Sequence, residues 1–230
     1  MARFSRGLVH RRALQRRRHD GAGVGGAEEL QEEGWPSRGW FWRGRERDFR
    51  GEKRSNQTHQ STTDPQARLY RKAHSAESKL SYLGHVVIEN RNGLVVGCMA
   101  TQATGRAERE AAEALMGNVP RAQRATLAAD KAYDARSFIA AMRAQGVTPH
   151  VTQNAYPGRR SAIDKRTTRH AGYGISQLWR KSIEHPFGWL KAAAGIRQVK
   201  MKGLALVGWV FTLGMVAYDL VRMRRLLCPA

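Results

Sequence analysis

The sequence predicts a mixed α/β domain, in which an opening hairpin is followed by alternating strands and helices. Residues 80–89 are rich in β-branched and aromatic side chains, as strands are. Asn92 and Gly93 then form a strong turn signal ahead of a second strand-like run at 94–101. The shorter apolar runs that follow alternate with helical segments, which is the order that builds a sheet covered by helices.

The elements after the hairpin are expected in a regular order. Acidic residues in the first turn favour the first helix, and Gly146 is a suitable residue to end the second. In chain order we expect a helix at 107–116, a strand at 125–129, a helix at 137–145, a strand at 147–151, a basic loop at 154–174, and helices at 176–194 and 204–226.

The charge of the chain predicts a polyanionic partner. Forty Lys and Arg residues against nineteen Asp and Glu give the 230-residue chain a formal charge of +21. Because unneutralised charge repels itself in a compact domain, nucleic acid is the expected partner, ahead of an anionic membrane. The apolar fraction of 41% is enough for a core and excludes wholesale disorder.

Two further features bear on location. Two cysteines, Cys98 and Cys228, can form neither a disulfide framework nor a four-cysteine zinc site, so a cytoplasmic compartment is expected. Residues 1–20 are basic without the apolar segment of a secretory signal. The apolar run Leu204–Tyr218 is shorter than the ~20 residues that span a bilayer, so we expect a buried core helix and no membrane partner.

The chain divides near residue 46. Residues 1–45 are dominated by Arg, Gly, Glu and Trp, and they hold no sustained period of 2 or 3.6. We therefore expect an irregular basic leader at 1–45 and a folded domain at 46–230.

Two acidic residues stand out from the basic background. Asp130 follows a predicted strand, at the end where α/β sheets place ligand sites. Glu184 follows Arg180 by one helical turn and precedes Lys191 by seven residues, so the three share a helix face. A carboxylate between cations suits a metal-bound phosphate; the alternative is an ordinary ion pair between residues four apart.

Three segments resemble the bacterial insertion-sequence transposases of the DDE type. They are 51–72 (GEKRSNQTHQSTTDPQARLYRK), 129–134 (ADKAYD) and 163–222. The resemblance covers about 46–227 and implies an RNase H-like catalytic fold, a mixed sheet flanked by helices. It also implies that Asp130 is the second catalytic Asp.

The third acid of the family lies in a Tyr-x₂-Arg-x₃-Glu-x₆-Lys signature. Arg180, Glu184 and Lys191 match this spacing, whereas Gln177 stands at the Tyr position. The resemblance implies that Asp130 and Glu184 hold Mg²⁺ or Mn²⁺ for two-metal phosphoryl transfer. The ions would activate a water or a 3′-hydroxyl and stabilise the leaving oxygen.

The implied partner is DNA, both the transposon ends and the target. The basic residues expected to hold its phosphates are Arg180, Lys191, Lys53, Arg54, Lys165, Arg166, Arg169 and His170. The sequence leaves the oligomeric state open, with a homodimer among the alternatives. The resemblance places the protein in the bacterial cytoplasm, with the nucleoid.

The first catalytic Asp of the family has no counterpart in residues 1–45. The family carries Val-Asp-Gly-Thr, then Gln-Ala-Trp-Ala and Lys-Ser-Phe, upstream of the segment that starts at Glu46. Codons for residues 16–34, read from their second nucleotide, permit this order, and those for residues 31–33 force a basic run. We infer that residues 1–45 are translated out of the ancestral frame, with the lost Asp at the boundary of Arg17 and Arg18.

The fold is therefore expected to be incomplete at its N-terminal strand, and catalysis to be impaired. Asp20 and Asp48 are the candidates to replace the lost acid. Two alternatives stay open: a non-catalytic DNA-binding transposase remnant, and a small basic RNA-binding or ribosome-associated protein. The spacing of Asp130 and Glu184 within family motifs disfavours the latter.

Overall fold

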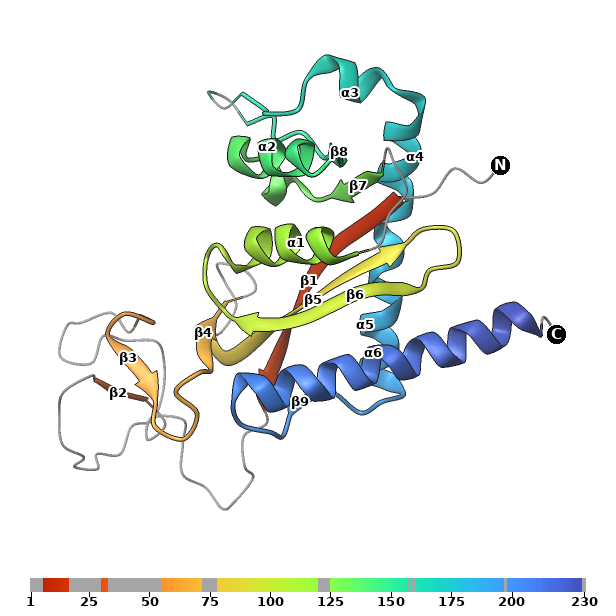
Figure 1. Cartoon of the computed structure of the whole chain (residues 1–230). Coiled ribbons are helices and arrows are strands. Elements are labelled where there is room, and N and C mark those ends of the chain that lie inside the picture. Colours follow the sequence, from red (N-terminus) through yellow and green to blue (C-terminus); the bar gives the residue numbers. More distant parts are fainter. Residues whose placement is uncertain are drawn as a thin grey trace.

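A mixed β-sheet runs through the centre of the domain (Figure 1). The computed structural model describes residues 6–16, 30–32, 55–71, 78–119, 125–156, 158, 160–196 and 198–228. Within these residues seven strands form one sheet, whose main path is β4-β5-β1-β7-β8, with β6 beside β5 and β9 beside β1. The predicted α/β class is confirmed.

The hairpin of β5 (Lys79–Glu89) and β6 (Val95–Gln102) confirms the two strands expected first. The turn between them uses Gly93 at φ 71°, a backbone angle that glycine adopts without steric cost. The Glu89 carboxylate accepts the N–H groups of Arg91 at 2.9 Å and Asn92 at 2.6 Å, which fixes the turn. Residues 81–88 of β5 are all buried, so this strand lies inside the domain on both of its faces.

Strands β7 (Thr126–Ala129) and β8 (Thr148–Val151) confirm the two short buried strands. They pair in parallel, from Thr126 opposite Thr148 to Ala129 opposite Val151. Helix α2 (Arg136–Ala144) connects them, as a parallel pair requires.

The expectations of an irregular leader and of a missing N-terminal strand are wrong for the described part of residues 1–45. Strand β1 (Arg6–Arg16) lies between β5 and β7, antiparallel to the first and parallel to the second. Strand β2 (Leu30–Glu32) pairs with β3 (His59–Ser61) in a separate two-stranded sheet. The physical reason is that a buried β5 needs a partner for its backbone N–H and C=O groups, whatever the partner's side chains are.

Helices cover both faces of the sheet. Val86 and Val87, adjacent on β5, point to opposite faces and belong to different buried clusters. Val87 packs with Phe138 of α2 and with α1 (Ala107–Asn118). Val86 packs with Phe187 of α5 (Glu184–Ala192) and Phe211 of α6 (Leu204–Leu227). Two short strands, β4 (Arg68–Tyr70) and β9 (Gln198–Val199), complete the sheet.

The helix expected at 176–194 is broken in the structure. Helix α4 (Ala171–Trp179) leads into a 3₁₀ turn, η2 (Arg180–Ile183), before α5 (Glu184–Ala192). Pro186 has no N–H to donate to the Ser182 carbonyl, so a regular helix cannot pass through 182–186 and a new one begins at Glu184. Part of the expected loop is also helical, because α3 spans Lys165–Arg169.

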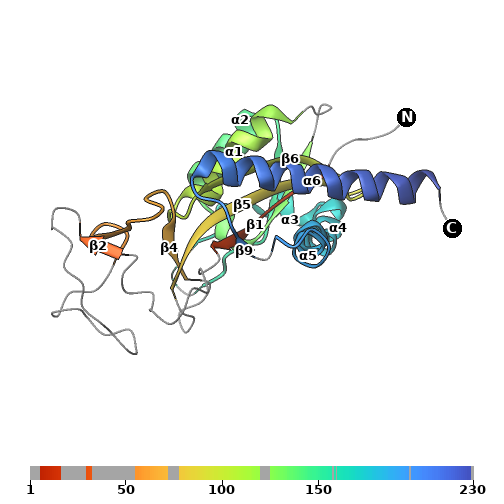
Figure 2. The same cartoon turned by 90° about the horizontal axis from the view of Figure 1, so that it is seen from below.

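The last helix, α6 (Leu204–Leu227), lies across α5 and extends beyond the sheet at its C-terminal end (Figures 1 and 2). Side chains from far back in the chain cap its start: Asp64 accepts the Gly203 N–H at 3.3 Å, and Gln66 accepts the Leu204 N–H at 2.6 Å. Asp64 is buried and also accepts the Tyr82 hydroxyl at 2.7 Å. Residues 64–66 therefore connect α6 to β5.

Helix α6 is a core helix on one face only. Val207, Phe211, Met215 and Tyr218 are buried against the sheet and α5, as predicted, but the opposite face is exposed. Among the described residues α6 is also the one helix long and apolar enough to cross a membrane, by length and composition alone. Core helices of soluble domains pass the same test.

Two glycines of α6 test how tightly it packs. A Cβ at Gly214 would press on Leu190 Cδ1 and lie 3.2 Å from Ile196 Cδ1, whereas a Cβ at Gly208 would meet Ala100 Cβ at 3.8 Å. We predict that Gly214→Ala lowers the free energy of unfolding by about 1–3 kcal/mol through overpacking. Gly208→Ala should raise it by up to about 1 kcal/mol, because alanine is the better helix former. Denaturant unfolding measures both, and equal effects would contradict the packing described here.

Candidate functional site

The structure brings Asp130 and Arg180 together from positions fifty residues apart. Asp130 follows β7 and begins the 3₁₀ turn η1 (Lys131–Tyr133), while Arg180 begins η2. The Arg180 guanidinium donates through Nη1 to Asp130 Oδ1 in a partly exposed ion pair. The carboxylate at the end of the strand thus has a cation against it.

Glu184 lies on the exposed surface one turn after Arg180. It lines a hollow of about 560 Å³ between α5 and α6, together with His185, Gly188, Trp189, Tyr218, Val221, Arg222 and Arg225. Lys191 is exposed in the last turn of α5 and is not among these lining residues. Glu184 therefore faces a groove with two arginines, and the predicted cation Lys191 lies further along the helix.

Gln177, which stands at the Tyr position of the signature, has a structural role in this chain. Its amide donates to the His150 carbonyl at 2.6 Å and accepts the Thr152 hydroxyl at 2.6 Å. Ser176 Oγ lies 2.7 Å from His150 Nδ1. These bonds fix α4 to the end of β8, and so they fix the position of Arg180 one turn later.

The motif ADKAYD contains a second acid, whose role sequence reasoning missed. Asp134 is buried; its Oδ2 accepts the Asn154 N–H at 2.7 Å and its Oδ1 accepts the Ala162 N–H at 2.8 Å. Tyr133, just before it, packs on Phe138 with ring centroids 5.2 Å apart. Asp134 therefore holds the two ends of the loop that follows β8, and no local sequence pattern marks this role, because both partners lie twenty or more residues further along the chain.

No carboxylate comes from the strand beside Asp130. The parallel pairing of β1 with β7 ends at Leu8 opposite Ala128, so two residues further on His10 is level with Asp130. The sequence of β1, RGLVHRRALQR, has no Asp or Glu. The two predicted substitutes, Asp20 and Asp48, lie outside the described residues.

The donor set fits a divalent metal only in part. Asp130 and Glu184 are oxygen ligands of the kind Mg²⁺ prefers, but Asp130 is already paired with Arg180. Within the part of the chain that the structure describes, no three His, Cys, Asp or Glu side chains are grouped to hold an ion. The described residues therefore do not complete a two-metal site.

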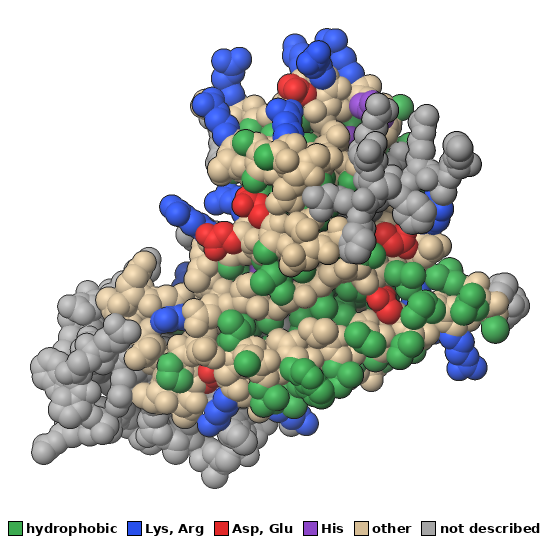
Figure 3. All heavy atoms as spheres, in the orientation of Figure 1, with side chains coloured by type: hydrophobic (Ala, Val, Ile, Leu, Met, Phe, Trp, Pro, Cys, Tyr) green, Lys and Arg blue, Asp and Glu red, His purple; other side chains and the backbone are tan. Residues whose placement is uncertain are grey.

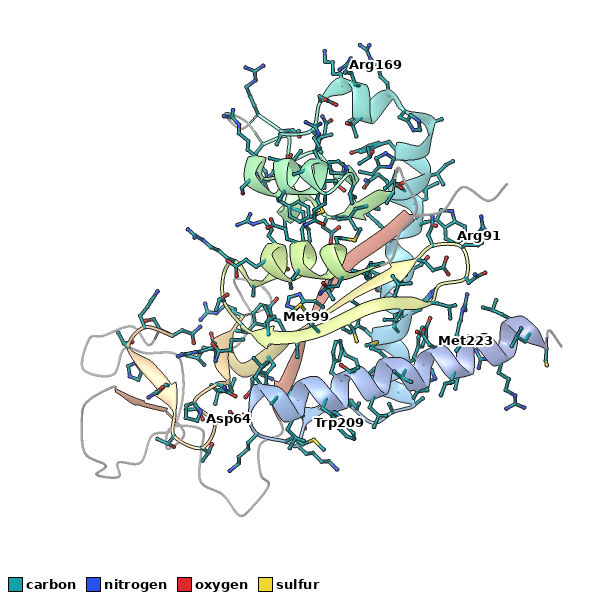
Figure 4. The ribbon with its side chains drawn as sticks, viewed as in Figure 1. Asp64, Arg91, Met99, Arg169, Trp209 and Met223 are labelled. Carbon is teal, nitrogen blue, oxygen red and sulfur yellow. The ribbon has the colours of Figure 1, made fainter. Side chains whose placement is uncertain are left out.

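Basic side chains gather at the end of the domain that carries α3 (Figures 3 and 4). Lys165, Arg166 and Arg169 are exposed there, and His170 Nδ1 accepts the Gly172 N–H at 3.1 Å, which starts α4. Lys53 and Arg54 lie outside the described residues.

Three further arginines, which sequence reasoning did not single out, extend this basic end. Arg136, Arg143 and Arg160 line a hollow of about 350 Å³ with Ser161. Asp164 begins α3 there, and its pKa is lowered by the Thr167 backbone N–H and hydroxyl and by Arg143, which lies 3.2 Å away. Arg136 and Arg143 lie seven residues apart on α2 and share a helix face, which the sequence could have shown, whereas Arg160 joins them only through the loop that Asp134 holds.

An α/β domain with an acid after a central strand and another on a late helix matches the expectation for a DDE-type enzyme. A family model described as transposase DDE domain matches residues 54–220, which is more than half of the chain. The chain therefore belongs to the transposase DDE domain family, and the resemblance is confirmed. No curated protein matches the chain significantly.

The role of Asp134 can be tested by replacing its side chain with that of alanine. We predict that Asp134→Ala lowers the free energy of unfolding by about 2–4 kcal/mol, since two backbone N–H groups lose their acceptor. Hydrogen exchange should quicken at Asn154 and Ala162. The control is Asp164→Ala, which removes an exposed helix cap and should cost about 1 kcal/mol. If Asp134→Ala behaves like the control, the two hydrogen bonds do not hold the loop.

Proposed function

We propose that the chain is a DNA-binding DDE transposase domain whose strand cleavage and strand transfer are impaired. Membership of the family supports a role in DNA transposition, and DDE transposases generally use divalent metal ions. The proposal assigns the metal-binding roles to Asp130 and Glu184. A bacterial cytoplasmic location, with the nucleoid, is part of the proposal.

One observation carries the impairment: the strand beside Asp130 offers no acid. Two ions about 4 Å apart must be held rigidly while charge builds on the phosphate, and two carboxylates cannot do this as three do. The ion pair of Arg180 with Asp130 adds to the deficit, because a metal would have to displace the guanidinium. The order of β6, β5, β1, β7 and β8 supports an RNase H-like assignment of the sheet.

The second candidate is a DNA-binding remnant without cleavage activity. The Asp130–Arg180 ion pair favours it, since the guanidinium neutralises the acid in place of a metal. Both candidates share the DNA contact. We propose that the phosphates lie along Lys165, Arg166, Arg169 and His170 at the basic end, with Arg180 and Lys191 nearer Asp130 and with Lys53 and Arg54 contributing.

Activity separates the two candidates. With Mn²⁺ or Mg²⁺ and DNA carrying the element's ends, we expect nicking by the unaltered chain to be weak or absent. Restoring the ancestral frame across residues 16–45 should raise it at least 100-fold, and Asp130→Asn or Glu184→Gln in the repaired chain should abolish it. Robust nicking by the unaltered chain would contradict the impairment. Failure of a folded, repaired chain would favour the remnant.

The register of β1 offers a separate position for a new acid, away from the lost Asp at the boundary of Arg17 and Arg18. We predict that His10→Asp, level with Asp130, raises Mn²⁺ affinity at least tenfold over the unaltered chain, measured by calorimetry. Arg11→Asp is the control, because residue 11 lies one position further along β1 and is not level with Asp130. Equal affinities in the two variants would mean that β1 does not place residue 10 beside Asp130.

DNA binding should depend on salt and on the basic end. We predict that affinity falls linearly with salt on a log–log plot, and that Arg169→Ala reduces the slope by about 0.9, the loss of one phosphate contact. Arg91→Ala is the matched control, since Arg91 lies in the turn between β5 and β6, away from α3 (Figure 4). Equal slopes for the two variants would place the DNA elsewhere.

A further inference from the structure

Helix α6 has two apolar faces, and the described residues cover only one of them. The inner face packs on the sheet and α5 through Val207, Phe211 and Met215, each 1% exposed. On the space-filling surface apolar side chains run along the length of α6 (Figure 3). A helix that is apolar all round is normally buried all round. The outer face of α6 therefore needs a partner.

The outer apolar residues follow one regular spacing. Steps of three and four residues alternate along Leu206, Trp209, Leu213, Val216, Leu220, Met223 and Leu227. We call these seven residues the α6 seam. Their exposure runs from 38% at Met223 to 81% at Leu227. Trp209 and Met223 mark its two halves in Figure 4.

An alternating step of three and four is the repeat of a coiled coil. This repeat keeps the apolar stripe of one helix facing a second helix. The apolar side chains of each helix then fill the gaps between those of the other. Neither a flat protein surface nor a lipid requires this repeat. The seam therefore fits a helix that carries the same spacing.

The exposed area of the α6 seam is large enough for a stable protein–protein interface. The seven side chains leave on the order of 700 Å² uncovered, close to the ~800 Å² that each partner of a standard interface buries. Monomeric proteins rarely expose a contiguous apolar patch larger than a few hundred Å².

We propose that the occupant of the α6 seam is the α6 seam of a second copy of this chain, related by a two-fold axis. Each copy carries the same stripe, so the contact is self-complementary and closes as a dimer. This proposal is independent of whether cleavage activity survives.

Polar bonds on the inner side of α6 disfavour a bilayer as the occupant. Asp219 accepts the Val95 N–H at 2.9 Å, and Arg222 donates to the Asn92 carbonyl at 2.7 Å. The Tyr218 hydroxyl donates to the Gly93 carbonyl at 3.3 Å. A helix that crossed a membrane would break all three bonds and leave the sheet uncovered.

The first test is the oligomeric state of the full chain, by sedimentation over a concentration series. We expect a monomer–dimer equilibrium, and a dissociation constant at least 100-fold higher for the double variant Leu213→Glu/Leu220→Glu. Arg225→Glu, on the same helix but off the seam, should dimerise like the unaltered chain. Circular dichroism and thermal unfolding check that the double variant stays folded.

The second test uses disulfide cross-linking to show how the two helices are oriented. Cys228 is exposed one residue beyond the seam. In a parallel pair, mild oxidation should link Cys228 to Cys228 of the other copy. In an antiparallel pair, Leu206→Cys should link to Cys228 of the other copy instead. An internal link is excluded, because 22 residues of helix span about 33 Å. Either product supports the proposal.

Three outcomes would overturn it. One is a monomer at every concentration, and a monomer that binds uncharged phosphatidylcholine vesicles through the seam would make lipid the occupant. The second is a dimer that persists in the folded Leu213→Glu/Leu220→Glu variant. The third is a dimer that gives neither thiol product.

Discussion

The backbone pairing of β5 is the constraint on which the rest of the structure depends. Residues 81–88 of this strand are buried, so their N–H and C=O groups need partners on both edges. Strand β6 satisfies one edge and β1 the other, along nine residue pairs from Gly7–Glu89 to Gln15–Ser81. Every other layer is placed relative to these three strands: β7 beside β1, and the helices on either face.

This constraint separates what the fold needs from what the chemistry needs. Backbone pairing accepts almost any side chain, so a strand rich in arginine can occupy the central place beside β7. A metal site accepts only a few ligand types, and β1 offers none of the carboxylates. A strand whose residues have changed can thus retain its place in the sheet while losing a catalytic group.

Most of the fold could be predicted from the sequence, and the exceptions have physical causes. The strands at 79–89, 95–102, 126–129 and 148–151 follow from apolar runs between clear turn signals, and they are confirmed. Strand β1 could not be predicted, because its pattern is weak and its formation depends on the edge of β5, a tertiary constraint. The break at η2 could have been read from Pro186, since proline cannot continue a helix.

The candidate site was predictable in its residue types but not in its contacts. Asp130 and Glu184 stand out because they are acids within recognisable motifs. That Arg180 pairs with Asp130 rather than along its own helix depends on how α4 docks on β8 through Gln177, which no local pattern reveals. The roles of Asp130 and Glu184 in metal binding stay predictions. Asp134 was missed because its two partners, Asn154 and Ala162, come together only in the folded loop.

The capping of α6 by Asp64 and Gln66 has a consequence for how the domain opens. The helix start, residues 64–66 and the Tyr82 hydroxyl on β5 form one connected set of hydrogen bonds. Cooperative opening units are roughly contiguous in the structure, so these bonds favour opening of the helix start together with β5. We therefore expect the start of the C-terminal helix to open with the domain centre, although the helix lies last in the chain and its other end protrudes from the sheet (Figure 1).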